Sequence, residues 1–151
     1  MTELVQAIAA HQFSAPAERV FDAWLNPADV RAWLSQPIDD NPGFDVRRVE
    51  TDPRVGGRFT FSDQREQQEA VHWGYYREID RPATLEFTWF TSEDEEREDS
   101  SVVRLTLSPL PQGCEATIVH SMDERYAQWV EQTARGWTML MRKIDLAVGG
   151  E

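Results

Sequence analysis

The strongest hydrophobic pattern lies in the last part of the chain, from Ser121 to Val148. Ser121 and Glu124 have the spacing of a capping box, and Gly149-Gly150 follows the last apolar position. Largely apolar side chains recur between these limits at steps of three and four residues, the period of one helical face. They are Tyr126, Trp129, Val130, Thr133, Trp137, Leu140, Met141, Ile144 and Val148. The pattern predicts one long amphipathic helix.

Gly136 interrupts this predicted helix near its middle. A glycine in a helix interior costs about 1 kcal/mol relative to alanine. A helix that accepts this cost needs either a close approach of neighbouring backbone or room for another molecule beside it. We therefore expect Gly136 to mark one of these two situations.

The first third of the chain predicts one strand and two short helices. Residues 4–13 alternate weakly and contain no strand-breaking residue, which favours a strand. Ser14-Ala15-Pro16 is typical of a helix start, because proline is tolerated in a first turn. Asn26-Pro27 predicts a second helix with Asn26 as its N-cap. The expected buried stripes are Val20, Phe21, Trp24 and Leu25 for the first helix, and Val30, Trp33 and Leu34 for the second.

Beyond a loop at residues 36–43, the hydrophobic period changes from 3.6 to 2, which is typical of strands. Turns rich in Pro, Gly and Asp separate the alternating segments. These segments are 44–51, 58–62, 71–79, 85–90, 103–107 and 115–120. Gly74 lies inside one of them, where an isolated glycine suggests a bulge.

Consecutive hairpins imply an antiparallel sheet, and the C-terminal helix is the one element long enough to cover its apolar face. The predicted fold class is therefore α+β. A curved antiparallel sheet of about six to seven strands is expected to wrap around the long C-terminal helix, with two short helices after the first strand. We see no internal repeat or linker, so we expect a single domain over residues 1–151.

Composition and charge exclude several classes of protein. The net charge of −12 argues against a generic binder of nucleic acid or anionic membranes, because phosphates would be repelled. One cysteine, Cys114, excludes an internal disulfide and a cysteine-rich zinc site. No run approaches the roughly 20 apolar residues of a membrane span, and residues 4–10 do not resemble a signal peptide. We expect a cytoplasmic protein without membrane insertion.

Residues 93–99 form a dense acidic run. Such a run is typical of a solvated loop. It lacks the ligand spacing and the glycine of a calcium-binding EF-hand loop, so we reject a calcium site.

Five segments together resemble a known family, in this order and spacing. They are residues 13–24, 54–59, 74–82, 85–89 and Gly136-Trp137. The set resembles the homologues of the activator of heat-shock-protein-90 ATPase, within the START-like, polyketide-cyclase-like superfamily (SRPBCC). The resemblance covers nearly the whole chain, and it implies a helix-grip fold with a deep apolar cavity between sheet and last helix.

The resemblance leaves function open, because this superfamily includes lipid and sterol carriers, hormone receptors, polyketide aromatases and cyclases, and co-chaperone domains. The eukaryotic activator has an additional N-terminal domain that engages the chaperone, and these 151 residues do not include it. The resemblance therefore does not imply that this chain activates a chaperone.

The three histidines are too scattered to predict a metal site, and no cofactor motif is present. We expect His11 to be exposed, near the end of the first strand. His72 and His120 lie on strands that both line the sheet interior in this scheme, so they are the candidate catalytic bases. The alternative for an inward histidine is a hydrogen-bonded core residue. No Ser-His-Asp order is found, and Cys114 is expected to be an inert thiol.

The aromatic side chains are more numerous than a core of this size requires, and wide rings on a concave sheet leave a cleft typical of a small-molecule pocket. The predicted ligand-binding residues are Trp33, Phe59, Phe61, Trp73, Tyr76, Phe87, Trp89, His120, Trp129, Thr133, Trp137 and Met141. Arg47 or Arg48 are further polar candidates. The facing of each strand stays open, because one bulge reverses it.

Three functions remain as hypotheses. The first is a protein that binds an apolar or aromatic small molecule between sheet and helix. The second is a cyclase or hydrolase that uses His72 or His120 as general base. The third is a stress-related interaction protein that uses the acidic run as its contact surface. A homodimer is compatible with the number of aromatic residues, but no residue pattern indicates its interface.

Overall fold

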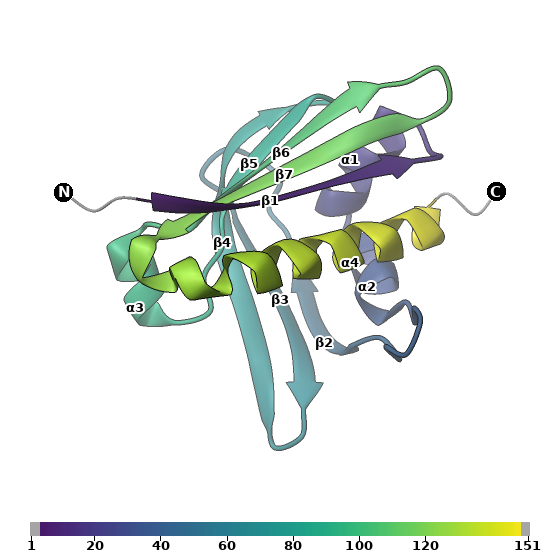
Figure 1. The fold of residues 1–151 in the computed structure, drawn as a ribbon. Helices are drawn as coiled ribbons and strands as arrows, with labels where there is room; N and C mark the ends of the chain where they lie inside the picture. The colour runs from purple at the N-terminus through teal and green to yellow at the C-terminus, as the bar shows by residue number, and fades with distance from the viewer. Residues whose placement is uncertain (1–3, 149–151) are drawn as a thin grey trace.

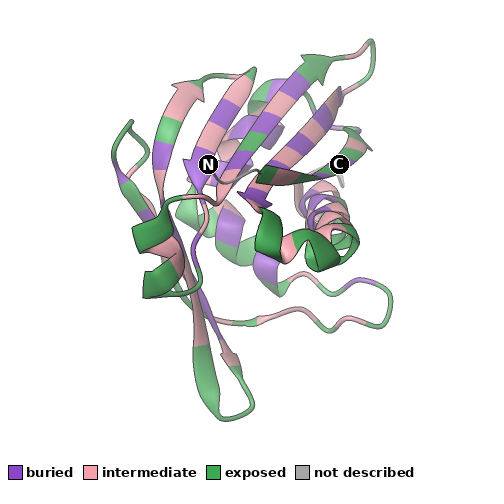
Figure 2. Cartoon of the chain, turned by 60° about the vertical axis from the view of Figure 1, so that its left-hand side comes forward, coloured by how far each residue is buried: buried purple, intermediate pink, exposed green. Residues whose placement is uncertain are grey.

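Within residues 4–148, which the computed structural model describes, seven strands form one antiparallel sheet that curves around the last helix (Figure 1). The order of the strands in the sheet is β1-β7-β6-β5-β4-β3-β2. Their bounds are β1 Leu4–Phe13, β2 Asp45–Glu50, β3 Arg58–Arg65, β4 Gln68–Asp80, β5 Thr84–Thr88, β6 Val102–Pro109 and β7 Cys114–Asp123. Buried and more exposed residues alternate along β1, β6 and β7, as the period of two predicts (Figure 2). In β3 the residues from Phe59 to Asp63 are all buried, so both of its faces are covered there. The predicted α+β helix-grip fold is confirmed.

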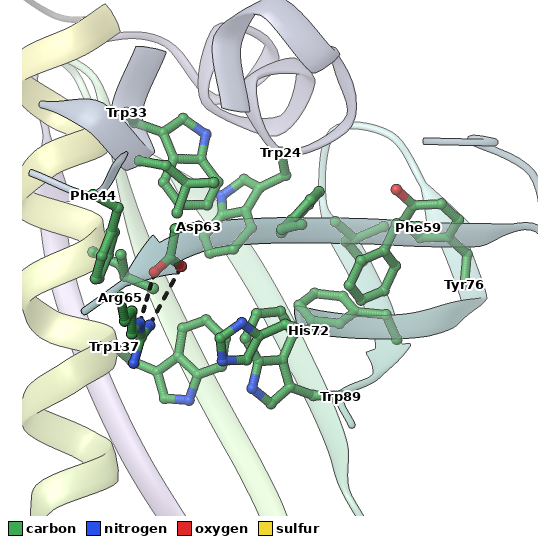
Figure 3. Close-up of a pocket in the computed structure, with 15 residues that line it drawn as sticks. Trp24, Trp33, Phe44, Phe59, Asp63, Arg65, His72, Tyr76, Trp89 and Trp137 are labelled. Atoms are coloured by element: carbon green, nitrogen blue, oxygen red, sulfur yellow. Dashed lines mark hydrogen bonds and ion pairs between the residues drawn. The ribbon is translucent and has the colours of Figure 1, made fainter. Parts of the chain in front are cut away.

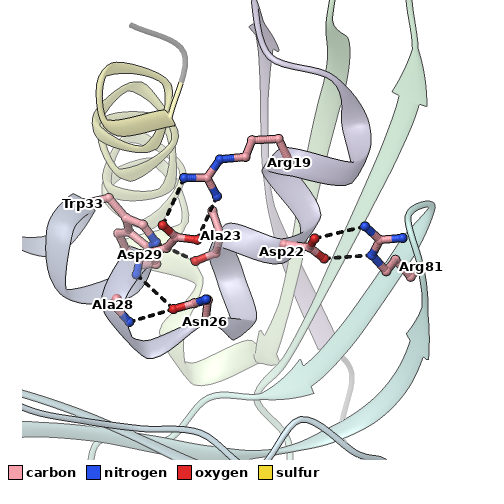
Figure 4. Close-up of polar contacts among 8 residues, drawn as sticks. All are labelled: Arg19, Asp22, Ala23, Asn26, Ala28, Asp29, Trp33 and Arg81. Atoms are coloured by element: carbon pink, nitrogen blue, oxygen red, sulfur yellow. Dashed lines mark hydrogen bonds and ion pairs between the residues drawn. The ribbon is translucent and has the colours of Figure 1, made fainter. Parts of the chain in front are cut away.

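Two short helices follow β1, as predicted: α1 Ala17–Leu25 and α2 Pro27–Ser35. Asn26 caps α2, because its Oδ1 accepts hydrogen bonds from the backbone N–H groups of Ala28, at 2.9 Å, and Asp29, at 3.4 Å (Figure 4). Arg19 pairs with Asp29 in the same view, which ties the two helices together. A second pair joins Asp22 of α1 to Arg81 in the turn between β4 and β5. Both helices thereby lie against one end of the curved sheet.

The long helix α4 runs from Val130 to Val148, so its predicted start at Ser121 was wrong. Ser121 lies in β7, which pairs with β1 as far as Asp123. This pairing keeps the segment extended, and no capping box forms between Ser121 and Glu124. The Asp123 side chain instead accepts from the backbone N–H of Arg125 at 2.9 Å and caps a 3-10 helix, η1 Glu124–Trp129. The predicted stop at Gly149-Gly150 lies outside the described residues.

The acidic run is a short helix, α3 Glu93–Glu98, and not a loop as predicted. Its Glu96 carboxylate accepts hydrogen bonds from Trp73 Nε1, at 2.8 Å, and from the Tyr75 hydroxyl, at 2.9 Å. These two bonds, first that from Trp73, lower the pKa of Glu96. The charges of α3 do face solvent, as the composition suggested, but β4 holds the helix in place.

The structure also corrects the predictions for His11 and Gly74. His11 is half-buried, and its Nε2 lies 3.0 Å from Asp145 Oδ2 of α4. The bulges of the sheet lie between Val46 and Arg48 and between Tyr76 and Glu78, not at Gly74. Gly74 marks instead a close approach of two backbone segments, because an added Cβ there would lie 1.9 Å from the carbonyl oxygen of Thr88.

Helix α4 packs on β1 and on α2 and closes the open side of the sheet. The core beneath it contains Phe21, Leu105, Ile118, Met141 and Ile144, all fully buried. None of the helices in the described part of the chain is long and apolar enough to cross a membrane.

Candidate functional site

A cavity with two lobes lies between the sheet and α4, as Figure 3 shows for the inner one. The inner lobe has a volume of about 110 Å³. It is lined by Trp24, Trp33, Leu34, Phe44, Phe59, Phe61, Asp63, Arg65, His72, Tyr76, Leu85, Phe87, Trp89, Trp137 and Leu140. The outer lobe has a volume of about 440 Å³ and includes Ser101, His120, Trp129, Thr133 and Gly136 in its lining.

Trp89 of the sheet side and Trp137 of α4 line both lobes. Their ring centroids lie 5.3 Å apart, with an interplanar angle of 63°. Phe44 and Leu140 also line both lobes. We call this shared boundary the neck of the cavity. A molecule that occupied both lobes would therefore contact both indole rings.

Most of the predicted ligand-binding residues line this cavity. In the inner lobe these are Trp33, Phe59, Phe61, His72, Tyr76, Phe87, Trp89 and Trp137, and in the outer lobe His120, Trp129 and Thr133. The structure brings them together because β3, β4 and β5 each direct alternate side chains to the concave face.

Trp73 and Met141 do not line the cavity, so their predicted placement was wrong. Trp73 follows His72 on β4 and faces the opposite side of the sheet, where its Nε1 donates to Glu96 of α3. Met141 is fully buried within the core, away from both lobes. Arg47 and Arg48 of β2 form exposed ion pairs with Asp45 and Glu50 and are also absent from the lining.

Two charged residues of the inner lobe, Asp63 and Arg65, were not predicted. They continue the inward face of β3 beyond Phe61, two and four residues on. The prediction missed them because it ended the strand at Ser62 and assigned the following polar residues to a hairpin end. Extending the alternation to Arg65 would have found both. Trp24 was recognised as a buried helix residue but not as a wall of the cavity.

His120 is buried, with 5% exposure, and both of its ring nitrogens are hydrogen-bonded. Trp137 Nε1 lies 3.0 Å from His120 Nδ1, and an indole N–H can only donate. Nδ1 is therefore the acceptor, and in the neutral ring the proton resides on Nε2. Nε2–H then donates to Ser101 Oγ at 2.8 Å.

The direction of this hydrogen bond excludes His120 as a general base that activates the Ser101 hydroxyl, although the distance of 2.8 Å suggests that role at first sight. A general base needs its lone pair on the nitrogen next to the hydroxyl, but here that nitrogen carries the proton. Burial lowers the pKa of His120 to about 4, so the ring stays neutral at pH 7. His120 is thus a hydrogen-bonded core histidine, the alternative that we set beside catalysis.

His72 contributes an aromatic face to the inner lobe. Its ring stacks on Trp89 with centroids 5.0 Å apart and an interplanar angle of 23°. Burial, and after it the charge of Arg65, lowers the pKa of His72. The ring is therefore neutral at pH 7 and suits an apolar ligand.

The sequence profile of one family, described as Activator of Hsp90 ATPase homolog 1-like protein, matches residues 14–149. The chain belongs to this family. No curated protein matches it.

Solved structures with the same START-like fold support the architecture of this family member. A protein of unknown function from Staphylococcus aureus has a TM-score of 0.78 at 15% identity, over 99% of this chain and 96% of that one. A protein from Rhodobacter sphaeroides has a TM-score of 0.78 at 18% identity, over 96% and 93%. One from Chromobacterium violaceum has a TM-score of 0.73 at 22% identity, over 95% and 96%. At these identities the similarity concerns the fold.

The charged residues at the α4 side of the inner lobe compensate one another in this family member. Arg65 Nε lies 2.6 Å from Asp63 Oδ1, the pair that Figure 3 shows, and Asp63 is only 5% exposed. The fully buried Lys143 donates to the Leu34 carbonyl at 3.0 Å and lies 4.4 Å from the Phe44 ring centroid. Burial lowers the pKa of Lys143, while Asp63 opposes this shift. Within residues 4–148, no group of three or more His, Cys, Asp or Glu side chains could hold a metal ion.

Two buried polar atoms that belong to lining residues have no hydrogen-bond partner within the described chain. They are Trp24 Nε1 and the Tyr76 hydroxyl. An unpaired buried donor costs about 1–3 kcal/mol, so such a group needs an explanation. Burial, and after it the charge of Asp52, raises the pKa of Tyr76, so the hydroxyl keeps its proton. Both groups are donors.

Tyr76→Phe is expected to raise the free energy of unfolding by about 1 kcal/mol, because it removes an unpaired buried hydroxyl and keeps the ring. Urea denaturation of the two proteins at pH 7 measures this difference. Tyr75→Phe is a control of opposite sign, since the Tyr75 hydroxyl donates to Glu96. A loss of stability in Tyr76→Phe would mean that a partner such as bound water satisfies the hydroxyl.

Proposed function

We propose that the protein binds a small, predominantly apolar molecule in the two-lobed cavity, with one aromatic ring packed against Trp89 and Trp137 at the neck. The outer lobe of about 440 Å³ carries this proposal. It lies within the range of about 300–1,000 Å³ that small-molecule sites occupy. The protein's own aromatic side chains surround this space without filling it.

The inner lobe supports the same function on a smaller scale. Its volume of about 110 Å³ is somewhat below the roughly 150 Å³ of an engineered apolar cavity that binds benzene. One ring-sized group could enter it with small shifts of Phe59, Trp89 or Trp137. The bulk of the ligand would then lie in the outer lobe.

Binding is favoured over general-base catalysis because His120 has no available lone pair next to Ser101. His72 faces the ring of Trp89 at 5.0 Å. An aromatic surface of this kind supplies affinity for a ring through contact area and stacking.

Gly136→Leu tests the proposal. An added Cβ at Gly136 would meet no atom within 4 Å. Of the two situations expected for this glycine, a close approach of neighbouring backbone is therefore wrong, and there is room beside the helix. Thr133, Gly136, Trp137 and Leu140 form one stripe of α4 along the outer lobe. A leucine side chain would extend from this stripe into the lobe and occupy space that the ligand needs.

We expect Gly136→Leu to weaken binding of the neutral fluorescent probe N-phenyl-1-naphthylamine at least tenfold, which corresponds to about 1.4 kcal/mol. The same substitution should stabilise α4 by up to about 1 kcal/mol through helix propensity. Titration of probe fluorescence and urea denaturation measure the two effects. Gly136→Ala is the control, with the gain in stability and little loss of affinity. A stabilised Gly136→Leu variant with unchanged affinity would contradict the proposal.

A further inference from the structure

The hydrogen bonds around the neck end in a single donor, the hydroxyl of Ser101. Trp137 Nε1–H donates to His120 Nδ1 at 3.0 Å, and His120 Nε2–H donates to Ser101 Oγ at 2.8 Å. Because Ser101 Oγ is the acceptor in the second bond, its own proton points elsewhere. No side chain or carbonyl within residues 4–148 accepts this proton, and Ser101 lines the outer lobe. The hydroxyl therefore presents its proton to the cavity.

Ser101 is held in place from both sides of the neck. Its carbonyl oxygen accepts a hydrogen bond from the backbone N–H of Trp89 at 3.1 Å. Its hydroxyl connects through His120 to Trp137. Hydrogen bonds in series polarise one another, so the last donor of the chain is strengthened. The backbone of Trp89 and, through His120, the indole of Trp137 thus position the Ser101 hydroxyl beside the neck.

The charges around the outer lobe oppose an anionic ligand. Glu95 and Asp123 are part of its lining, and the whole chain carries a net charge of −12. A carboxylate would be repelled there, whereas a neutral oxygen acceptor would not. The unpaired Trp24 Nε1 and Tyr76 hydroxyl of the inner lobe are donors as well. The cavity therefore offers hydrogen-bond donors without a partner among the described residues, which suit a ligand that carries an acceptor atom.

We infer that the ligand is a neutral aromatic carbonyl compound whose oxygen accepts a hydrogen bond from Ser101 Oγ while its ring lies at the neck. This inference rests on the proposed binding function and names its ligand class. Ser101 is then the residue that determines specificity, with His120 and Trp137 as the groups that orient it.

Two probes of equal shape test this inference: 2-acetylnaphthalene, with a C=O group, and 2-isopropenylnaphthalene, with C=CH₂ in its place. Both are measured by displacement of N-phenyl-1-naphthylamine from the wild-type protein and from Ser101→Ala. We expect Ser101→Ala to shift the ratio of the two dissociation constants against the ketone by about five- to tenfold. The affinity for the alkene should change less than twofold.

Two controls separate the hydrogen bond from a general change of the lobe. Ser100 also lines the outer lobe but takes no part in the hydrogen bonds that join Trp137, His120 and Ser101. Ser100→Ala should therefore leave the ratio of the two dissociation constants unchanged. Ser101→Thr keeps a hydroxyl and should retain the ketone preference. A third probe, 2-naphthoate, should bind more weakly than the ketone, because the lobe disfavours an anion.

A measurement on the wild-type protein makes the test independent of how well Ser101→Ala folds. The carbonyl carbon of ¹³C-labelled 2-acetylnaphthalene should move downfield on binding, relative to its position in hexane, as it does on hydrogen bonding. An unchanged ratio in Ser101→Ala, or a hexane-like carbonyl resonance, would overturn the inference. If the fluorescent probe itself does not bind, the proposed function fails first, so the two failures are distinguishable.

Discussion

Lowering the pH from 6.5 to 4 is expected to cost the folded protein about 3 kcal/mol through His120 alone. Burial lowers the pKa of His120 from 6.5 to about 4 in the folded chain. Between these values the unfolded chain binds a proton that the folded chain does not, so stability falls as the pH falls. At about 1.4 kcal/mol per pH unit this interval corresponds to about 3 kcal/mol, and below pH 4 no further loss arises from this group.

Protonation also has a local consequence at the neck. The imidazolium ring carries a proton on Nδ1, which can then no longer accept from Trp137 Nε1. A buried charge and a lost hydrogen bond would therefore arise together. The orientation of Ser101 depends on the same ring, so ligand affinity should also decrease in this pH range.

His120→Gln is the matched control for this prediction, because an amide can accept and donate but does not titrate. Urea denaturation of both proteins from pH 7.5 to pH 4 gives the two stability profiles. The wild-type profile should fall more steeply between pH 6.5 and 4. His72 and the carboxylates titrate in both proteins and cancel in the difference. Parallel profiles would show that His120 is not buried in its neutral form.

Gly74→Ala is expected to destabilise the protein by about 3 kcal/mol or more, as overpacking against rigid backbone does. An added Cβ would lie 1.9 Å from the carbonyl oxygen of Thr88 and 2.8 Å from the ring of Phe59. Tyr75 N–H donates to Thr88 Oγ1 at 2.8 Å, which holds the two segments together. Phe59 is part of the inner lobe, so relief of the clash would disturb the cavity wall.

The same substitution at Gly136 provides the comparison. An added Cβ there meets nothing within 4 Å, so Gly136→Ala should stabilise the protein by up to about 1 kcal/mol. Thermal and urea denaturation of both variants measure the opposite signs. A Gly74→Ala variant as stable as the wild type would mean that β4 and Thr88 can separate at little cost.

The elements of this fold could largely be predicted because each depends on neighbours along the chain. The period of two marked the strands, and the period of 3.6 marked the helix that carries Trp137 and Ile144. Asn26 capped its helix as predicted, because an Asn side chain reaches the N–H groups two and three residues on. The acidic α3 could not be predicted, since the bonds that hold Glu96 come from Trp73 and Tyr75, more than twenty residues away.

The candidate site was predictable in kind but not in detail. The excess of aromatic residues indicated a cavity, and most of the predicted residues line it. Trp73 was misplaced because its facing depends on the register of β4 in the assembled sheet. Asp63 and Arg65 were missed because their polarity suggested a turn, although they continue the inward face of β3.

The amino-acid sequence by itself determined the order of the strands and of α1, α2 and α4, the helix-grip arrangement and the aromatic character of the interior. These follow from local periodicity and from the amount of apolar surface to be buried. The tertiary structure alone decided that Gly136 borders open space while Gly74 does not. It also decided the direction of the hydrogen bonds from Trp137 through His120 to Ser101. Both depend on distances between segments far apart in the chain, which no local pattern encodes.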